Sequence, residues 1–89
     1  MFYVYILKSR IDNNLYTGYT SDLRRRLSEH NKKMNRSTKG RTPLDLLYYE
    51  AYTSQADAKL RESRIKHSAG ARTALKRRLT NCLRSGHFV

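Results

Sequence analysis

The chain has 89 residues and a formal net charge of +12, from 19 Lys and Arg against seven Asp and Glu. This length excludes two full domains and predicts one domain over residues 1–89. The single cysteine, Cys82, excludes an internal disulfide, and we expect it to be a small buried apolar residue. The charge predicts a polyanion as partner.

The N-terminal residues have their apolar run before the first positive charge, which is the wrong order for a secretory signal. No apolar run approaches the ~20 residues that a membrane-spanning helix needs. We therefore expect a soluble cytoplasmic protein, without membrane contact and monomeric by default. Residues 58–89 carry nine positive charges and one negative, so most of the basic excess lies in the C-terminal third.

Residues 2–7 are almost all aromatic or β-branched, which favours a strand buried on both faces. The turn-forming residues 12–14 and the β-type residues 15–17 then predict a hairpin over 2–18. If the loop is centred between Arg10 and Ile11, Tyr5 and Tyr16 lie opposite one another across the two strands.

Either Thr20 or Ser21 can cap a helix that begins at Asp22. Leu23 and Leu27 form the buried stripe of this helix, since they are four residues apart. The sequence therefore predicts that a first helix follows the hairpin directly.

Residues 32–43 are polar and basic, and Gly40 and Pro43 break regular structure, so we expect an exposed, mobile loop. Five cations in this segment have no acid near them in the sequence: Lys32, Lys33, Arg36, Lys39 and Arg41. Residues 44–52 are rich in leucine and tyrosine and are predicted to form the third strand.

Ser54, with Asp57 three residues later, resembles a capping box and predicts a second helix that ends near Gly70. Apolar residues then recur every four positions and predict a third helix, with a stripe made of Ala71, Leu75, Leu79 and Leu83. This helix exposes Arg72, Lys76, Arg77 and Arg78. The order ββα-β-αα predicts an α+β fold, a three-stranded, mostly antiparallel sheet flanked by helices.

Several familiar kinds of site are absent from the sequence: a glycine-rich phosphate loop, a pair of nearby cysteines and a His-Glu-x-x-His run. Four other motifs occur in order: Tyr3-Val4-Tyr5, Tyr16-Thr17-Gly18, the run at residues 22–31, and Arg61-Glu62-x-x-Ile65-Lys66. Together they resemble the GIY-YIG nuclease superfamily, and in particular its small stand-alone bacterial proteins, the YhbQ-type group. The resemblance covers residues 2–66.

The resemblance implies a GIY-YIG-type fold, endonuclease (hydrolase) chemistry, and roles for particular residues. It implies catalytic roles for Tyr5, Tyr16, Arg26 and His30, and a metal-binding role for Glu62. Tyr3 stands where the motif name has glycine, a common variation that concerns the strand backbone. Tyr19 stands where some family nucleases have a basic residue, which leaves the general base unassigned.

The residues themselves leave alternatives open. The two tyrosines can orient water, or activate it if nearby cations lower the phenol pKa, or they can be sheet aromatics packed over a core. The guanidinium of Arg26 can make two hydrogen bonds to a phosphate, or Arg26 can belong to a run of charged residues exposed to solvent. His30 can donate to phosphate or shuttle a proton near neutral pH, or it can be a cation at a helix end. Glu62, surrounded by cations, can hold Mg²⁺ or form an i,i+4 pair with Lys66.

We therefore predict an endonuclease that hydrolyses DNA phosphodiester bonds with Mg²⁺ or Mn²⁺. The alternative is a nucleic-acid-binding module of the same fold with little or no turnover. In both cases basic side chains bind the phosphate backbone with little sequence preference. The predicted binding residues are Lys32, Lys33, Arg36, Lys39, Arg41, Lys66, Arg72, Lys76 and Arg77.

Overall fold

The computed structural model describes residues 1–36 and 38–85, and it confirms the predicted α+β fold. The elements in chain order are β1 (Phe2–Ser9), β2 (Leu15–Thr20), α1 (Leu23–Asn31), the 3₁₀ turn η1 (Lys39–Arg41), β3 (Leu44–Tyr52), α2 (Gln55–His67), α3 (Ala69–Arg78) and α4 (Thr80–Ser85). Among the described helices, none is both long enough and apolar enough to cross a bilayer.

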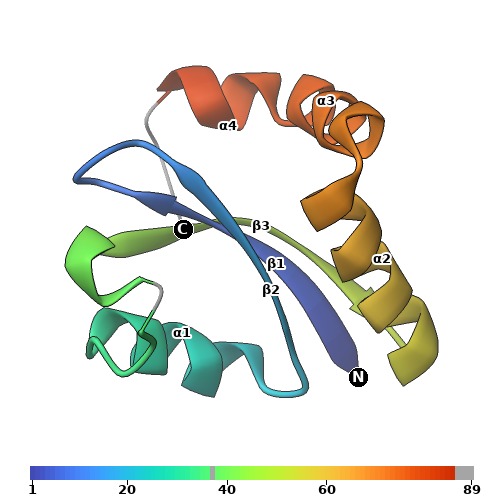
Figure 1. Ribbon diagram of the computed structural model, residues 1–89, viewed down its shortest axis with the longest axis horizontal. Coiled ribbons are helices and arrows are strands. Elements are labelled where there is room, and N and C mark those ends of the chain that lie inside the picture. The colour runs from blue at the N-terminus through green and yellow to red at the C-terminus, as the bar shows by residue number, and fades with distance from the viewer. Residues whose placement is uncertain (37, 86–89) are drawn as a thin grey trace.

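The three strands form one antiparallel sheet in the order β2-β1-β3. The β1 strand is central, as its continuous apolar sequence predicts, and residues 4–7 are buried. Helix α1 lies on one face of the sheet, and α2, α3 and α4 lie on the other (Figure 1). The sheet is therefore the middle layer of three.

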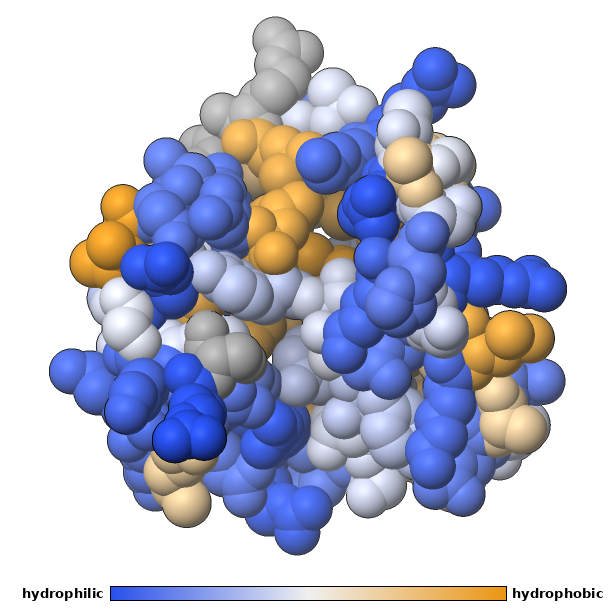
Figure 2. Space-filling model, viewed as in Figure 1, coloured by the Kyte–Doolittle hydropathy of each residue, from blue (hydrophilic) through white to orange (hydrophobic). Residues whose placement is uncertain are grey.

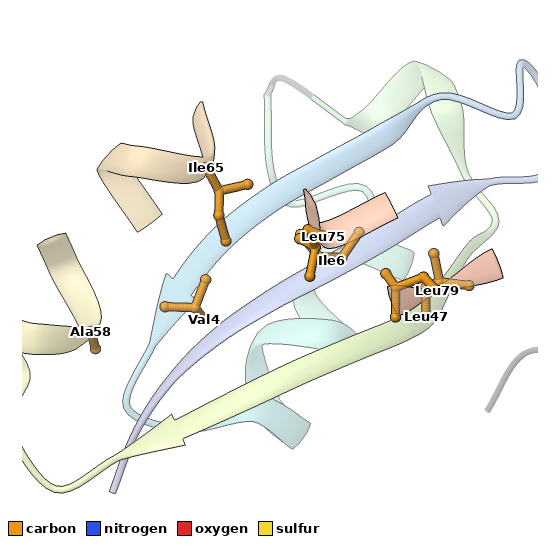
Figure 3. Packing of buried hydrophobic residues seen from close by; sticks show 7 residues of the cluster. All are labelled: Val4, Ile6, Leu47, Ala58, Ile65, Leu75 and Leu79. Carbon is orange, nitrogen blue, oxygen red and sulfur yellow. The ribbon is translucent and has the colours of Figure 1, made fainter. Parts of the chain in front are cut away.

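Alternate residues of β1 supply the two cores, because successive side chains of a strand point to opposite faces. Val4 and Ile6 pack with side chains of α2 and α3 in the larger core, which Figure 3 shows, and Leu47 joins them from β3. Tyr5 and Leu7 pack on the other face, where α1 contributes partly buried leucines. Cys82 is half-buried beside the larger core, so it is less enclosed than expected.

The predicted pairing of Tyr5 with Tyr16 is wrong. Tyr5 lies opposite Gly18, and Tyr16 lies opposite Leu7. The hairpin is centred one residue later than assumed, between residues 11 and 12: the Ser9 hydroxyl accepts from the backbone N–H of Ile11, and Asn13 adopts a positive φ of 60°. A shift of two residues keeps every side chain on its predicted face, so both tyrosines still face α1.

The helix ends differ from the predicted ones because other groups cap them. Asp22 itself caps α1, accepting from the backbone N–H of Arg25 at 3.1 Å, so neither Thr20 nor Ser21 is the cap. Ser54 caps α2 as predicted. Helix α2 ends at His67, before Gly70, because Ser68 accepts from the N–H of Ala71 and starts α3.

Two further features of the chain differ from the sequence-based expectation. The third predicted helix is two helices, since α3 ends at Arg78, with Leu79 as its C-cap, and α4 begins at Thr80. The basic segment is exposed at its cations but contains the turn η1 and a buried residue, Thr38. Arg41, expected without an acid, pairs with Asp12 of the hairpin loop at 2.9 Å.

Candidate active site

A small cavity of about 170 Å³ lies at the free edge of the sheet, beside β2. Its wall includes residues from both faces of β2 and from helices α1 and α2, which flank this edge in Figure 1. All five residues that the resemblance assigns to catalysis and metal binding line it: Tyr5, Tyr16, Arg26, His30 and Glu62. The predicted site residues, which come from four elements, are therefore brought together.

Tyr5 reaches this edge although it belongs to the central strand. Its neighbour on β2 is Gly18, and a Cβ atom built on Gly18 would lie 2.2 Å from the Tyr5 hydroxyl. The absence of a side chain at this position lets the phenol extend past the edge strand. Tyr5 is only 3% exposed, so its hydroxyl is presented to the cavity from a buried ring.

The Tyr5 hydroxyl begins a chain of buried hydrogen bonds. It lies 2.9 Å from Nε2 of His30, and Nδ1 of His30 lies 2.8 Å from the Thr38 hydroxyl. His30 is 4% exposed and Thr38 is 2% exposed. Because both ring nitrogens are engaged inside the protein, His30 is neither a solvated helix-end cation nor free to donate to a phosphate.

The electrostatics of these groups follow from their burial. Burial raises the pKa of Tyr5 above its ordinary value, although the neighbouring Arg26 acts to lower it. The expectation that cations make this phenol a better base is therefore wrong. Burial, and then the charge of Arg26, lower the pKa of His30 below its ordinary value. Around neutral pH the pair is therefore a neutral phenol and a neutral imidazole.

Arg26 lies on the side of α1 that faces the cavity and is one-third exposed. Its guanidinium is held by Glu29 at 3.1 Å, one turn along the helix. Glu29 also lies 3.9 Å from Arg25, so Arg26 has the shorter of the two contacts. This pairing orients the guanidinium toward the cavity while leaving N–H groups for a ligand.

Glu62 lies on the side of α2 that faces the cavity, and its carboxylate pairs with Lys66 at 3.0 Å. Both alternatives for Glu62 are therefore present in the geometry, since it lines the cavity and also forms the i,i+4 pair. Within residues 1–36 and 38–85 no cluster of three or more acids, histidines or cysteines is placed to hold a metal. One carboxylate with phenol oxygens nearby fits Mg²⁺, which commonly binds one or two carboxylates, waters and a substrate phosphate.

The position of Glu62 depends on its neighbour Arg61. Arg61 forks onto Glu50 of β3 with two hydrogen bonds of 3.0 Å, and the hydroxyls of Tyr48 and Tyr52 donate to the same carboxylate. Burial alone would raise the pKa of Glu50, but these donors lower it to about 2. This network fixes α2 against β3 on the side of the helix next to Glu62.

The two tyrosines of β2, Tyr16 and Tyr19, differ in their contacts. The Tyr16 hydroxyl lies 3.5 Å from Asp12, a contact too long to hold it firmly. Tyr19 accepts a hydrogen bond from Gln55 at 3.0 Å, and the Lys59 ammonium lies 5.6 Å from its ring centre. Tyr19 thus shares the cavity wall but is tied to the start of α2.

The predicted nucleic-acid-binding residues are exposed for the most part, but they do not form one group. Lys66 lines the cavity, whereas Arg72 caps the C-terminal end of α2 by donating to the carbonyls of Ile65 and Lys66 at 3.2 and 2.7 Å. Figure 2 shows hydrophilic side chains on both sides of an apolar hollow on the face it displays.

Sequence reasoning gave no role in the site to Thr17 and Gly18 of the cavity wall, nor to Asn35 and Thr38, which belong to the segment predicted as a mobile loop. No periodicity marks them, because the segment is irregular. Gly18 could be noticed from the sequence because it occurs in the second motif. Its role, which is to leave room for the Tyr5 ring, depends on the register of the hairpin and could not be read from the sequence.

Comparisons with known proteins show which family this chain resembles. The family model described as the GIY-YIG catalytic domain matches residues 1–80. A UPF0213 protein of Halobacterium salinarum is 42% identical over 72 residues, which are 80% of this chain and 92% of that protein. A UPF0213 protein of Staphylococcus haemolyticus is 46% identical over 65 residues, 72% of this chain and 78% of that protein.

A solved structure is also similar. The solution NMR structure of the UPF0213 protein BH0048 from Bacillus halodurans has a TM-score of 0.54 and 38% sequence identity, and the match covers 84% of this chain and 82% of that one. The likeness therefore extends over most of both chains.

Proposed function

This chain belongs to the GIY-YIG catalytic domain family, and from that premise we propose that it is an endonuclease that hydrolyses DNA phosphodiester bonds with Mg²⁺ or Mn²⁺. The observation that carries the proposal is the convergence of Tyr5, Tyr16, Arg26 and Glu62 on one cavity at the sheet edge. These residues are far apart in the sequence, and a packing role alone does not require polar ends to meet.

The proposed roles follow from the contacts of each group. Tyr5 is a neutral phenol held by His30, so it orients the attacking water through its oxygen, and Tyr16, whose hydroxyl is loosely held, assists. Arg26 stabilises the additional negative charge that develops on the phosphate. Glu62 would hold the cation, which would neutralise phosphate charge when bound.

The exposed cations bind the nucleic acid backbone. Lys66 lies at the cavity, and Lys32, Lys33, Arg36 and Lys39 project from the segment that supplies Asn35 and Thr38 to its wall. Neutralising phosphates with these residues releases counterions, so affinity falls steeply with salt.

The alternative function is a nucleic-acid-binding module without turnover. One observation favours it: the Glu62 carboxylate is already paired with Lys66 at 3.0 Å. In this alternative the pair is structural, and no cation displaces the ammonium group.

The two functions are separated by incubating the protein with nicked, branched and single-stranded DNA in the presence of Mg²⁺, Mn²⁺ or EDTA. We expect products that depend on the metal. Glu62→Gln should abolish cleavage while DNA binding is retained or strengthened, because a negative charge leaves the site. Asp57→Asn makes the same change at an exposed acid in the first turn of the same helix and should still cut. Binding without products on every substrate would establish the module.

A further inference from the structure

We propose that Thr38 is a positioning residue of this site. Its hydroxyl accepts a hydrogen bond from Nδ1–H of His30, and this fixes the imidazole tautomer in which Nε2 accepts a hydrogen bond from the Tyr5 hydroxyl. The three side chains are buried and linked by contacts of 2.9 and 2.8 Å. Only the consequence for cleavage rests on the proposed function.

The direction of the first hydrogen bond follows from the neighbours of Tyr5. The hydroxyl carries one hydrogen, and its oxygen lies 2.9 Å from Nε2 of His30. Arg26 also hydrogen-bonds to Tyr5, and its guanidinium has donors and no acceptor, whereas Glu62 and Glu29 act on Tyr5 only through their charge. A buried hydroxyl hydrogen needs an acceptor, so Nε2 accepts and the phenol donates.

The direction of the second hydrogen bond follows from the chemistry of imidazole. A neutral imidazole has one N–H, so if Nε2 accepts, the proton is on Nδ1. The partner of Nδ1 must then accept, and the threonine hydroxyl oxygen at 2.8 Å does so. The charged groups that act on His30, Arg26 and Glu29, lie on the same helix and form an ion pair with each other at 3.1 Å.

The backbone holds Thr38 in the required place. Its N–H donates to the carbonyl of Asn35 at 3.2 Å, and its carbonyl accepts from the N–H of Arg41 at 2.9 Å. Thr38 is thus a buried residue within a segment whose described cations are exposed. The turn that presents cations to a polyanion also sets the orientation of the Tyr5–His30 pair.

Tyr5, His30 and Thr38 are linked in the same way as a nucleophile, the base that accepts from it, and a third group that orients the base. When the hydroxyl hydrogen of Tyr5 points to His30, the lone pairs of the phenol oxygen face Arg26 and the cavity, where they can accept from a water. Without the Thr38 hydroxyl, the ring can take the other tautomer, and Nε2–H then competes for the phenol oxygen.

The tautomer is measured by long-range ¹⁵N NMR of the imidazole rings, without nucleic acid or metal, and the His30 signals are assigned with His30→Gln. We expect wild type and Thr38→Ser to show a protonated Nδ1 and an unprotonated Nε2. Thr38→Val, which keeps the shape and removes the hydroxyl, should show a population with Nε2–H. A protonated Nε2 in the wild type, or a wild-type spectrum in Thr38→Val, would overturn the proposal.

If Thr38→Val does not fold, Thr38→Ala tests the same loss with a smaller side chain, and the wild-type spectrum alone still decides the tautomer. On a DNA substrate that wild type cuts, Thr38→Val should lower kcat about tenfold or more at unchanged KM, and Thr38→Ser should restore it. Equal kcat in wild type and Thr38→Val would overturn the positioning role. If wild type cuts no DNA, the proposed function fails, whereas the tautomer result is unaffected.

Discussion

The phenol ring of Tyr5 occupies the space beside Gly18 where any other residue would carry its side chain. A Cβ at position 18 would lie 2.2 Å from both the hydroxyl oxygen and the ring carbon that bears it. The two residues are direct neighbours on β1 and β2. The glycine of the second motif therefore decides where the tyrosine of the first motif can go.

Gly18→Ala should displace Tyr5 and break its hydrogen bond to His30. The ring is buried and rigid, so the overlap cannot be relieved by a small rotation, and we expect a loss of about 1–3 kcal/mol in the free energy of unfolding. Urea denaturation measures this loss. Gly40→Ala is the matched control, since nothing lies within 4 Å of a Cβ there. Equal stability of the two variants would show that the cavity has room for the displaced ring.

Most of the fold could be predicted because its signals are local. The composition of residues 2–7 and 44–52 indicated strands, and Ser54 with Asp57 indicated the start of α2. The register of the hairpin could not be predicted, because it depends on how Ser9 and Asn13 shape the loop. The break between α3 and α4 was also missed, because the apolar stripe continues through Leu79.

The candidate site was predicted through motifs, and its polar environment was not. Tyr5, Arg26, His30 and Glu62 line one cavity, as the family resemblance implies. Burial, which raises the pKa of Tyr5 and lowers that of His30, is a tertiary property with no local signal in the sequence. Thr38 meets His30 only because an irregular segment turns back onto α1.

His30 should make folding stability depend on pH near neutrality. Its folded-state pKa lies below its ordinary value of 6.5, so below that pH the unfolded chain binds more protons than the native protein. Stability should therefore be level above about pH 6.5 and fall as the pH drops through the folded-state pKa. Urea titrations of wild type and His30→Gln from about pH 8 to about pH 5 measure this, because glutamine does not titrate.

The control for this pH dependence is His67→Gln, which changes an exposed histidine in the last turn of α2. The free energy of unfolding of this variant should depend on pH as it does in the wild type. If the pH dependence persists in His30→Gln, another group takes up the proton.

Glu50 should produce a second loss of stability at lower pH. Hydrogen bonds from Arg61 and two tyrosines lower its pKa from 4.5 to about 2 in the folded state, so its contribution is present above pH 4.5 and is lost as the pH falls toward 2. The contribution is at most about 3 kcal/mol. Acid titration followed by circular dichroism should show a flatter curve for Glu50→Gln.

Asp45→Asn is the comparison for Glu50→Gln. Asp45 also accepts a fork from an arginine, but that partner, Arg10, is 63% exposed, so solvent screens the pair. This variant should follow the wild-type acid curve closely. If Glu50→Gln and Asp45→Asn change the acid-unfolding curve equally, the hydrogen bonds to Glu50 stabilise the fold no more than an exposed ion pair does.

Two cations one turn apart on α3 should differ in what they do. Both Arg72 and Lys76 are exposed, but Arg72 also donates to two carbonyls at the end of α2. Arg72→Ala should lower the free energy of unfolding by about 1–3 kcal/mol, since charged donors to backbone carbonyls contribute on this scale. Lys76→Ala should leave stability unchanged and weaken DNA binding, and the slope of log Kd against log salt should fall by about one unit if Lys76 neutralises one phosphate.

Urea denaturation and fluorescence anisotropy across a salt series measure the two effects. A large change in salt dependence with Arg72→Ala at unchanged stability would place its guanidinium on the phosphate backbone. Both hydrogen bonds from Arg72 to the carbonyls of Ile65 and Lys66 come from Nη1, so Nε and Nη2 remain as donors that a phosphate can accept from.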